Sequence, residues 1–125
     1  DVIVSDHKPE DEEKKRLTFD QAETGASGIE TLLPLSLELY HNGSVKLNTI
    51  IKALTSNPAK ILKINKGNLS IGSDADFCIV DLNKPWIVKK ENLYSKSKNT
   101  SIENKKLQGK VTNTFVKGEE LFKLL

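Results

Sequence analysis

The spacing of hydrophobic positions changes along the chain, from one continuous apolar run, to helical spacing, to the alternation typical of strands. The run is Val2-Ile3-Val4. It predicts a buried strand that ends at Ser5-Asp6-His7, before Pro9 interrupts it. In parallel α/β folds, catalytic groups collect at the C-terminal ends of strands. A carboxylate and an imidazole at this position therefore indicate either a functional site or a strand followed by a solvated turn.

The middle of the chain has helical spacing. Between Gly28 and Gly43, large apolar side chains recur at i, i+3, i+7 and i+8, namely Leu32, Leu35, Leu39 and Tyr40. This spacing predicts an amphipathic helix, and Asn42-Gly43 is typical of a helix end with left-handed backbone. We expect Pro34 to lie in the first turn of this helix or to mark a kink.

Two shorter helices are predicted next. Residues 47–55 form the first of them, which would bury Ile50, Ile51 and Leu54. The other would begin with Asn57 as its N-cap and Pro58 at its first helical position, and would run to Ile64.

Beyond Gly67 the pattern changes to strands and turns. We expect strands at residues 68–71, 75–81, 86–88, 107–116 and 119–122. Residues 72–74 and 117–118 are typical of turns, the second of them within a hairpin, and residues 91–106 of a surface loop.

The segment from Asp6 to Ser27 is long and polar, with only weak helical periodicity between Lys14 and Ala22. Loops longer than about 12–15 residues without structure of their own are usually functional or disordered. A functional role for this loop is therefore one of two open interpretations.

Composition narrows the classes of protein. The chain has 125 residues, room for one modest core, and a net charge of +2 with acids and bases interspersed, so no nucleic-acid footprint is evident. No apolar stretch reaches the length of a membrane span. The single cysteine, Cys78, excludes an internal disulfide framework and fits a reducing, cytoplasmic location. It lies in an apolar run, where we expect a buried, inert thiol.

The chain contains no Met and starts with an apolar run. We therefore expect it to be a fragment or a processed piece of something longer.

Several motifs, taken in order, resemble the cyclic amidohydrolases, and within them the dihydroorotases. They are Ser5-Asp-His-Lys-Pro9, Gly28-Ile-Glu-Thr-Leu-Leu-Pro-Leu35, Leu54-Thr-Ser-Asn-Pro-Ala-Lys-Ile61, Gly67-Asn-Leu-Ser-Ile-Gly-Ser-Asp-Ala-Asp-Phe77, Ser95-Lys-Ser-Lys-Asn-Thr100, Gly109-Lys-Val111 and Thr114-Phe-Val-Lys-Gly118. The Gly-Ser-Asp-Ala-Asp stretch is shared by many amidohydrolases. The Asp-His-x-Pro, Glu-Thr-x-Leu-Pro-Leu and Ser-Lys-x-x-Asn-Thr stretches are similar to dihydroorotase in particular.

This resemblance implies a fold. The chain would be an α+β fragment, with the last strand and helices of a metal-dependent (β/α)8 barrel followed by C-terminal strands of a small β-sandwich. Residues 1–66 would hold the final barrel strand, the active-site loop and the helices, and residues 67–125 would hold the sandwich strands.

The resemblance also implies roles for particular residues. Asp6 matches the superfamily carboxylate at the end of the final barrel strand, which would bind the metal and move a proton between water and the leaving nitrogen. His7 would orient neighbouring groups or face the substrate, or would be a hydrogen-bonded strand-end histidine. Gly25 and Ala26 match a place where the family presents main-chain groups to the pyrimidine ring.

Two positions, Glu10 and Ser101, depart from the family pattern. Glu10 stands where the family often has a histidine that helps bind the substrate carboxylate. A carboxylate there would repel an anionic substrate unless it turns away or pairs with Lys8 or Lys14. Ser101 replaces a usual proline, which should affect only loop stiffness. Glu30 is expected to favour the helix dipole and bind neighbouring backbone.

The implied cofactor is zinc, as one or two ions in the parent enzyme. Asp6 and His7 alone cannot make a closed zinc site, because three protein ligands are the usual minimum. We therefore expect the isolated fragment to retain no zinc and to be inactive.

The implied activity is interconversion of N-carbamoyl-L-aspartate and (S)-dihydroorotate in pyrimidine biosynthesis, with no nucleic-acid or membrane partner. Two alternatives stay open, a non-catalytic dihydroorotase-like partner of aspartate transcarbamoylase and an allantoinase- or dihydropyrimidinase-type hydrolase. The apolar start and the leucine face of the first long helix would lack barrel partners, so we expect a homo-oligomer.

Overall fold

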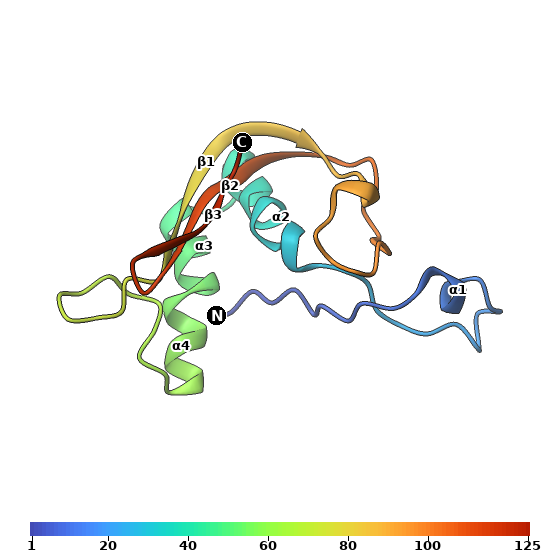
Figure 1. The fold of residues 1–125 in the computed structure, drawn as a ribbon, viewed down its shortest axis with the longest axis horizontal. Coiled ribbons are helices and arrows are strands. Elements are labelled where there is room, and N and C mark those ends of the chain that lie inside the picture. The colour runs from blue at the N-terminus through green and yellow to red at the C-terminus, as the bar shows by residue number, and fades with distance from the viewer.

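The computed structural model describes residues 1–125, and in it a three-stranded antiparallel sheet lies over a group of helices (Figure 1). The strands are β1 (Phe77–Ile87), β2 (Lys106–Val116) and β3 (Glu119–Lys123), in the order β1-β2-β3. Helix α2 (Ile29–His41) packs under the sheet, against β2. The first residues run past α2 to the short helix α1 (Glu12–Lys15), at the end of the molecule far from α4 (Ser56–Leu62).

The hairpin of β2 and β3 confirms the sequence prediction. The two strands pair in antiparallel register, with Val116 opposite Glu119. Lys117 and Gly118 join them with φ angles of 52° and 82°. Two consecutive residues with positive φ make the tight turn whose twist matches that of the flanking strands.

Strand β1 is longer than the sequence predicted. Residues 75–81 and 86–88 were expected as separate strands, but one strand covers most of both, so the prediction of a separate strand at 86–88 was wrong. The pairing register shifts between Asp81 and Pro85, where the Asp81 carboxylate accepts the N–H of Asn83 over 2.9 Å. Beyond this irregularity β1 pairs with β2 again, with Trp86 opposite Leu107. The continuous partner strand holds both halves in one sheet.

The three predicted helices are present, and several of their details differ. They are α2, α3 (Leu47–Leu54) and α4, and the last begins one residue before the expected N-cap. Instead of capping, the Asn57 side chain donates to the carbonyl oxygen of Asp1 over 2.7 Å. Ile51 was expected to be buried but is 38% exposed. Pro34 lies in the second turn of α2 rather than the first. As predicted, Asn42-Gly43 ends α2, and Gly43 has a φ of +78°.

The core lies where α2 meets β2. Leu37 is fully buried, and a Cβ on Gly109 would come within 2.5 Å of the Leu37 Cδ1 atom. Gly109 also has a φ of +101°, which side-chain-bearing residues rarely adopt. Glycine at this position therefore lets the helix approach the strand closely.

Two predicted strands do not form. Residues 1–10 have no strand structure, and the backbone of the Val2–Val4 run is held only by the Ile3 N–H, which donates to the Ala53 carbonyl over 3.1 Å. Val4 is 72% exposed. A strand needs a neighbouring strand for its hydrogen bonds, and none lies beside this segment. The expected final barrel strand is therefore absent as a strand.

Residues 68–71, the other predicted strand, form a turn region instead. The Asn68 side chain accepts hydrogen bonds from the Ser70 N–H (3.1 Å) and the Ser73 hydroxyl (2.7 Å). Such local side-chain bonds compete with strand pairing. The expectation of a buried Cys78 was also wrong, because its side chain is exposed on β1. Partial desolvation still raises the pKa of the Cys78 thiol.

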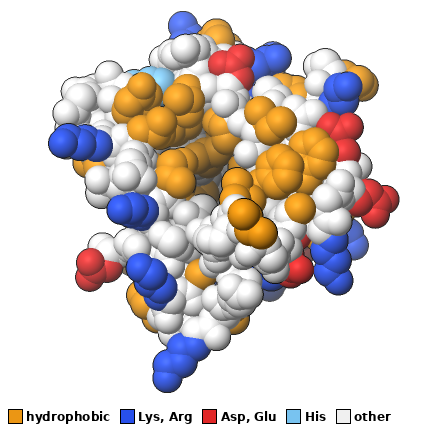
Figure 2. Space-filling view, turned by 90° about the vertical axis from the view of Figure 1, so that its left-hand side faces the viewer, with side chains coloured by type: hydrophobic (Ala, Val, Ile, Leu, Met, Phe, Trp, Pro, Cys, Tyr) orange, Lys and Arg blue, Asp and Glu red, His pale blue; other side chains and the backbone are white.

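Much apolar surface remains exposed in this chain. Phe19, Ile71 and Leu125 are among the large hydrophobic residues that are essentially fully exposed. Figure 2 shows hydrophobic side chains gathered around a hollow on one face of the molecule. No helix is both long enough and apolar enough to cross a membrane.

Candidate functional site

The segment that contains Asp6 lies against the loop that contains Gly25. The Lys8 N–H donates to the Ala26 carbonyl over 3.2 Å. A Cβ on Gly25 would come within 2.5 Å of the Lys8 carbonyl oxygen, and Gly25 has a φ of +116°. Only glycine allows this approach without strain, so Gly25 brings the two segments together.

A third segment, residues 95–99, closes this arrangement from the other side. The Ser27 N–H donates to the Asn99 carbonyl over 2.8 Å, and the Asn99 side-chain amide donates to the Gly25 carbonyl over 3.3 Å. The Ser27 hydroxyl also lies 3.0 Å from the Ser97 carbonyl, to which it donates. The loop around Gly25 is therefore held between two segments distant in sequence.

A cavity of about 560 Å³ opens beside these contacts. Three of the predicted site residues line it: Asp6, Gly25 and Ala26. The rest of its wall includes apolar side chains from the first residues and from α2, such as Val4 and Leu35. The fold thus brings a carboxylate and a pair of main-chain segments to one mostly apolar cavity, the usual composition of a small-molecule site.

Two backbone N–H groups of the Gly25–Ser27 stretch have no acceptor within the chain. The N–H groups of Gly25 and Ala26 donate no hydrogen bond within the chain, whereas the next one, of Ser27, is bonded to Asn99. Asp6, which lines the same cavity, is exposed and has a φ of +46°. Free N–H groups near a carboxylate can bind a carbonyl group while a proton is moved nearby.

His7 does not line the cavity; it holds the start of α2. Its Nδ1 atom accepts the N–H of Gly28 over 3.0 Å and lies 3.4 Å from the N–H donor of Ile29. Because Nδ1 is the acceptor, the neutral ring carries its proton on Nε2. The contacts support the interpretation of a hydrogen-bonded histidine, and its facing of a substrate stays a prediction.

Glu10 also lies outside the cavity wall, and its charge is paired. The Lys14 ammonium donates to its carboxylate over 3.0 Å, and the Lys8 ammonium lies 3.7 Å from it. The hydrogen bond from Lys14 holds the pKa of Glu10 below its ordinary value and raises the pKa of Lys14. Pairing with Lys8 or Lys14 is one condition under which Glu10 would tolerate an anionic substrate nearby.

The residues present do not fit a complete metal centre. No group of three or more His, Cys, Asp or Glu side chains is arranged to hold a metal ion. The His7 Nδ1 atom is already used by the start of α2. Asp6 can offer one ligand, which is fewer than the usual three.

Glu30 has a role that the sequence indicated only in outline. Its two carboxylate oxygens accept the N–H groups of Tyr94 and Ser95, each over 3.0 Å. Binding to backbone was expected, but the partner, more than sixty residues away in sequence, was not. No pattern in the sequence indicated this partner, because the donors are backbone N–H groups.

A second cavity, of about 710 Å³, lies between α2 and the sheet. Trp86, Leu33, Tyr94 and Phe122 are among its lining residues, and none of the predicted site residues is. The Lys110 ammonium lies 4.8 Å from the centre of the Trp86 ring. Its charged lining residues are Glu30, whose carboxylate accepts the backbone N–H groups of Tyr94 and Ser95, and the two lysines Lys89 and Lys110.

Comparison with known proteins identifies the family. Residues 2–121 match the Amidohydrolase family. The chain belongs to this family. It is 43% identical over 122 residues to the dihydroorotase of Ehrlichia canis (strain Jake), covering 98% of this chain and 27% of that protein. It is 42% identical to the dihydroorotase of Wolbachia sp. subsp. Drosophila simulans, covering 98% of this chain and 28% of the relative. The amidohydrolase chain thus spans less than a third of each relative.

Solved structures agree on the fold. Dihydropyrimidinase from Brevibacillus agri matches with a TM-score of 0.91 at 22% identity, over 98% of this amidohydrolase chain and 28% of that one. L-hydantoinase from Arthrobacter aurescens matches with a TM-score of 0.77 at 29% identity, over 84% of this chain and 25% of that one. The inactive dihydroorotase-like domain of a Chaetomium thermophilum CAD-like multifunctional protein matches with a TM-score of 0.58 at 21% identity. This match covers 79% of this chain and 26% of that one.

Proposed function

We propose that this chain is part of a dihydroorotase, which interconverts N-carbamoyl-L-aspartate and (S)-dihydroorotate. The observation that carries the proposal is the cavity that joins Asp6 to the free N–H groups of Gly25 and Ala26, in a chain 43% identical to a dihydroorotase. A cyclic imide or amide presents carbonyl groups that such donors can bind, and its hydrolysis needs a group that moves a proton.

Asp6 is the proposed proton carrier. As a carboxylate it can accept a proton from the attacking water, and as a carboxylic acid it can deliver that proton to the leaving ring nitrogen. Its exposed side chain on the cavity wall leaves it accessible to both groups. Gly25 and Ala26 would orient the ring through their N–H groups, while His7 holds the start of α2 in place.

Zinc is the proposed cofactor of the parent enzyme, where it would polarise the carbonyl and supply an activated water. This chain offers one candidate ligand, Asp6, so the other ligands would come from the part of the relatives that the chain does not cover. For the same reason we propose that the 125 residues alone are inactive. Metal-dependent turnover of dihydroorotate by the purified chain would contradict this.

The finer fold assignment is part of the proposal. Residues 1–66 would complete the barrel of the parent enzyme, and residues 67–125 would join its β-sandwich. The unpaired outer edge of β1, with its exposed Ile79 and Ile87, supports a further strand or sheet beside it. We also propose a homo-oligomer in the cytoplasm, with aspartate transcarbamoylase as a candidate partner.

A sister hydrolase of the dihydropyrimidinase type is the second candidate. The observation in its favour is the 29% identity to L-hydantoinase over 84% of this chain. The two candidates differ in the charge of the substrate, since dihydroorotate carries a carboxylate. The pairing of Glu10 with two lysines removes one objection to an anionic substrate and favours dihydroorotase.

The test is a chimera in which this chain replaces the matching 27% of the Ehrlichia canis dihydroorotase. We expect the chimera to hydrolyse dihydroorotate, and Asp6→Asn to reduce kcat by about a thousandfold or more while the protein stays folded. Lys60→Gln, an exposed change on α4, is the control and should leave kcat unchanged. A folded chimera that is inactive, or that prefers an uncharged dihydropyrimidine, would refute the dihydroorotase assignment.

A further inference from the structure

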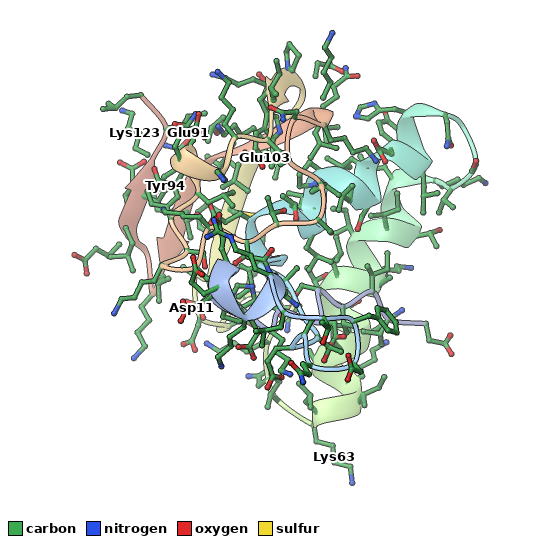
Figure 3. All side chains as sticks on the ribbon, turned by 90° about the vertical axis from the view of Figure 1, so that its right-hand side faces the viewer. Asp11, Lys63, Glu91, Tyr94, Glu103 and Lys123 are labelled. Carbon is green, nitrogen blue, oxygen red and sulfur yellow. The ribbon has the colours of Figure 1, made fainter.

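Glu30 ties the segment after β1 to the first turn of α2. One carboxylate oxygen accepts the N–H of Tyr94 and the other accepts the N–H of Ser95, each over 3.0 Å. Hydrogen bonds to a charged acceptor are stronger than neutral ones. Figure 3 shows Tyr94 beside the sheet, and its ring packs edge-on against that of Phe122 in β3. The start of this segment is therefore fixed to both helix and sheet.

The far end of the same segment is fixed to the wall of the cavity. The Asn99 side chain donates to the Gly25 carbonyl, and the Asn99 carbonyl accepts the Ser27 N–H. Between the two ends, the Ser97 hydroxyl donates to the Glu10 carbonyl over 2.6 Å. Within residues 25–27, these bonds leave the N–H groups of Gly25 and Ala26 without an acceptor in the chain.

Glu30 is not used as an ordinary helix-start acid. Acidic residues in a first turn commonly interact with the free N–H groups of their own helix. Here the Nδ1 atom of His7 takes the N–H groups of Gly28 and Ile29, and the Glu30 carboxylate is turned to a different segment. His7 thus holds the start of the helix, and Glu30 holds the backbone of residues 94 and 95.

We propose that Glu30 and Asn99 are positioning residues for substrate binding, which hold residues 94–99 as a brace behind the Gly25–Ser27 main chain. The brace keeps the free N–H groups of Gly25 and Ala26 oriented toward a cyclic amide in the cavity. This inference rests on the proposed function for its ligand, but not for the brace itself.

The experiment uses the chimera with the Ehrlichia canis dihydroorotase and two positioning variants. Glu30→Ala removes both acceptors, and Asn99→Asp keeps the shape of the side chain but replaces the donor to Gly25 with a repelling oxygen. We expect each to raise KM for dihydroorotate by about tenfold, with kcat changed by less than about threefold. Glu30→Gln retains one acceptor and should recover part of the loss.

Glu38 supplies the matched control. It lies on the same helix and is also a half-buried carboxylate, but it pairs with the Lys105 ammonium over 2.8 Å, outside the brace. Glu38→Ala removes a comparable interaction and should leave KM unchanged. A similar rise in KM for Glu38→Ala would show a general loss of structure and overturn the inference.

Hydrogen exchange of the same chimera separates this inference from the proposed function. If the brace exists, Glu30→Ala speeds amide exchange in peptides covering residues 24–28 and 94–99, whether or not the chimera turns over substrate. Unchanged exchange there, or faster exchange with an unchanged KM in an active chimera, overturns the inference. Should Glu30→Ala fail to fold, Glu30→Gln and Asn99→Asp apply the same two criteria.

Discussion

The Nδ1 atom of His7 accepts the backbone N–H of Gly28 over 3.0 Å, so a side chain near the start of the chain caps a helix twenty-one residues later. Gly28 itself has no side chain that could cap α2, and no other side-chain cap is present at this end. The hydrogen bond therefore links the segment of Asp6 to the element that carries much of the cavity wall.

Removing this cap should destabilise the chain. His7→Ala leaves the partly buried Gly28 N–H without an acceptor, and we expect the free energy of unfolding to fall by about 1 kcal/mol. His7→Asn can still present an acceptor and should recover much of this loss. Urea unfolding followed by Trp86 fluorescence measures both variants. Equal stability of His7→Ala and the original chain would contradict a capping role.

Gly25→Ala should open the contact between the two loop segments. The added Cβ would meet the Lys8 carbonyl at 2.5 Å in a backbone with φ of +116°. We expect a loss of about 1–3 kcal/mol of unfolding free energy, and faster amide exchange at Lys8.

Gly43→Ala is the matched control for this substitution. Gly43 also has a positive φ, +78°, but nothing lies within 4 Å of an added Cβ. Gly43→Ala should therefore lose only about 1 kcal/mol of unfolding free energy, from the strain of a side chain at positive φ. If both variants lose the same stability, the close approach at Gly25 contributes nothing.

The ion pair of Glu10 and Lys14 predicts a pH dependence of stability. The hydrogen bond from Lys14 lowers the pKa of Glu10 in the folded chain below the value of about 4.3 expected when unfolded. The stabilisation is thus fully present above the unfolded pKa and is lost as the pH falls through the lowered folded pKa.

We therefore expect the difference in stability between the original chain and Glu10→Gln to be constant near neutral pH and to shrink below about pH 4. The same difference should fall with added salt, because the Lys14 ammonium is exposed. Urea unfolding at a series of pH values measures it. A difference that grows on acidification would have the wrong sign and would refute the pairing.

Leu37 should be a sensitive position of the core. It is fully buried against Gly109, and Leu37→Ala should cost about 2–5 kcal/mol. Leu39 lies on the same helix but is 41% exposed, so Leu39→Ala should cost much less. Thermal unfolding of the two variants compares them directly. Similar losses would place the core elsewhere.

Local patterns in the sequence predicted the helices and the hairpin because the information for them is local. The i, i+3 and i+7 spacing of leucines describes one face of α2 whatever it packs against, and Asn42-Gly43 ends the helix through its own backbone preference. Lys117-Gly118 likewise determines the hairpin within a few residues. The resemblance carried by the motifs was confirmed by the family match over residues 2–121.

Local sequence patterns did not predict the contacts between segments that are distant in sequence. Val2–Val4 has the composition of a strand, but no strand lies beside it to share hydrogen bonds, so the segment stays irregular. His7 and Glu30 accept hydrogen bonds from backbone N–H groups that the fold brings to 3.0 Å from their side chains. Spacing along the chain contains no such information. The types of element and the candidate residues thus follow from sequence, whereas the partners of Asp6, His7 and Glu30 follow from folding, since hydrogen bonds depend on distance and direction in space.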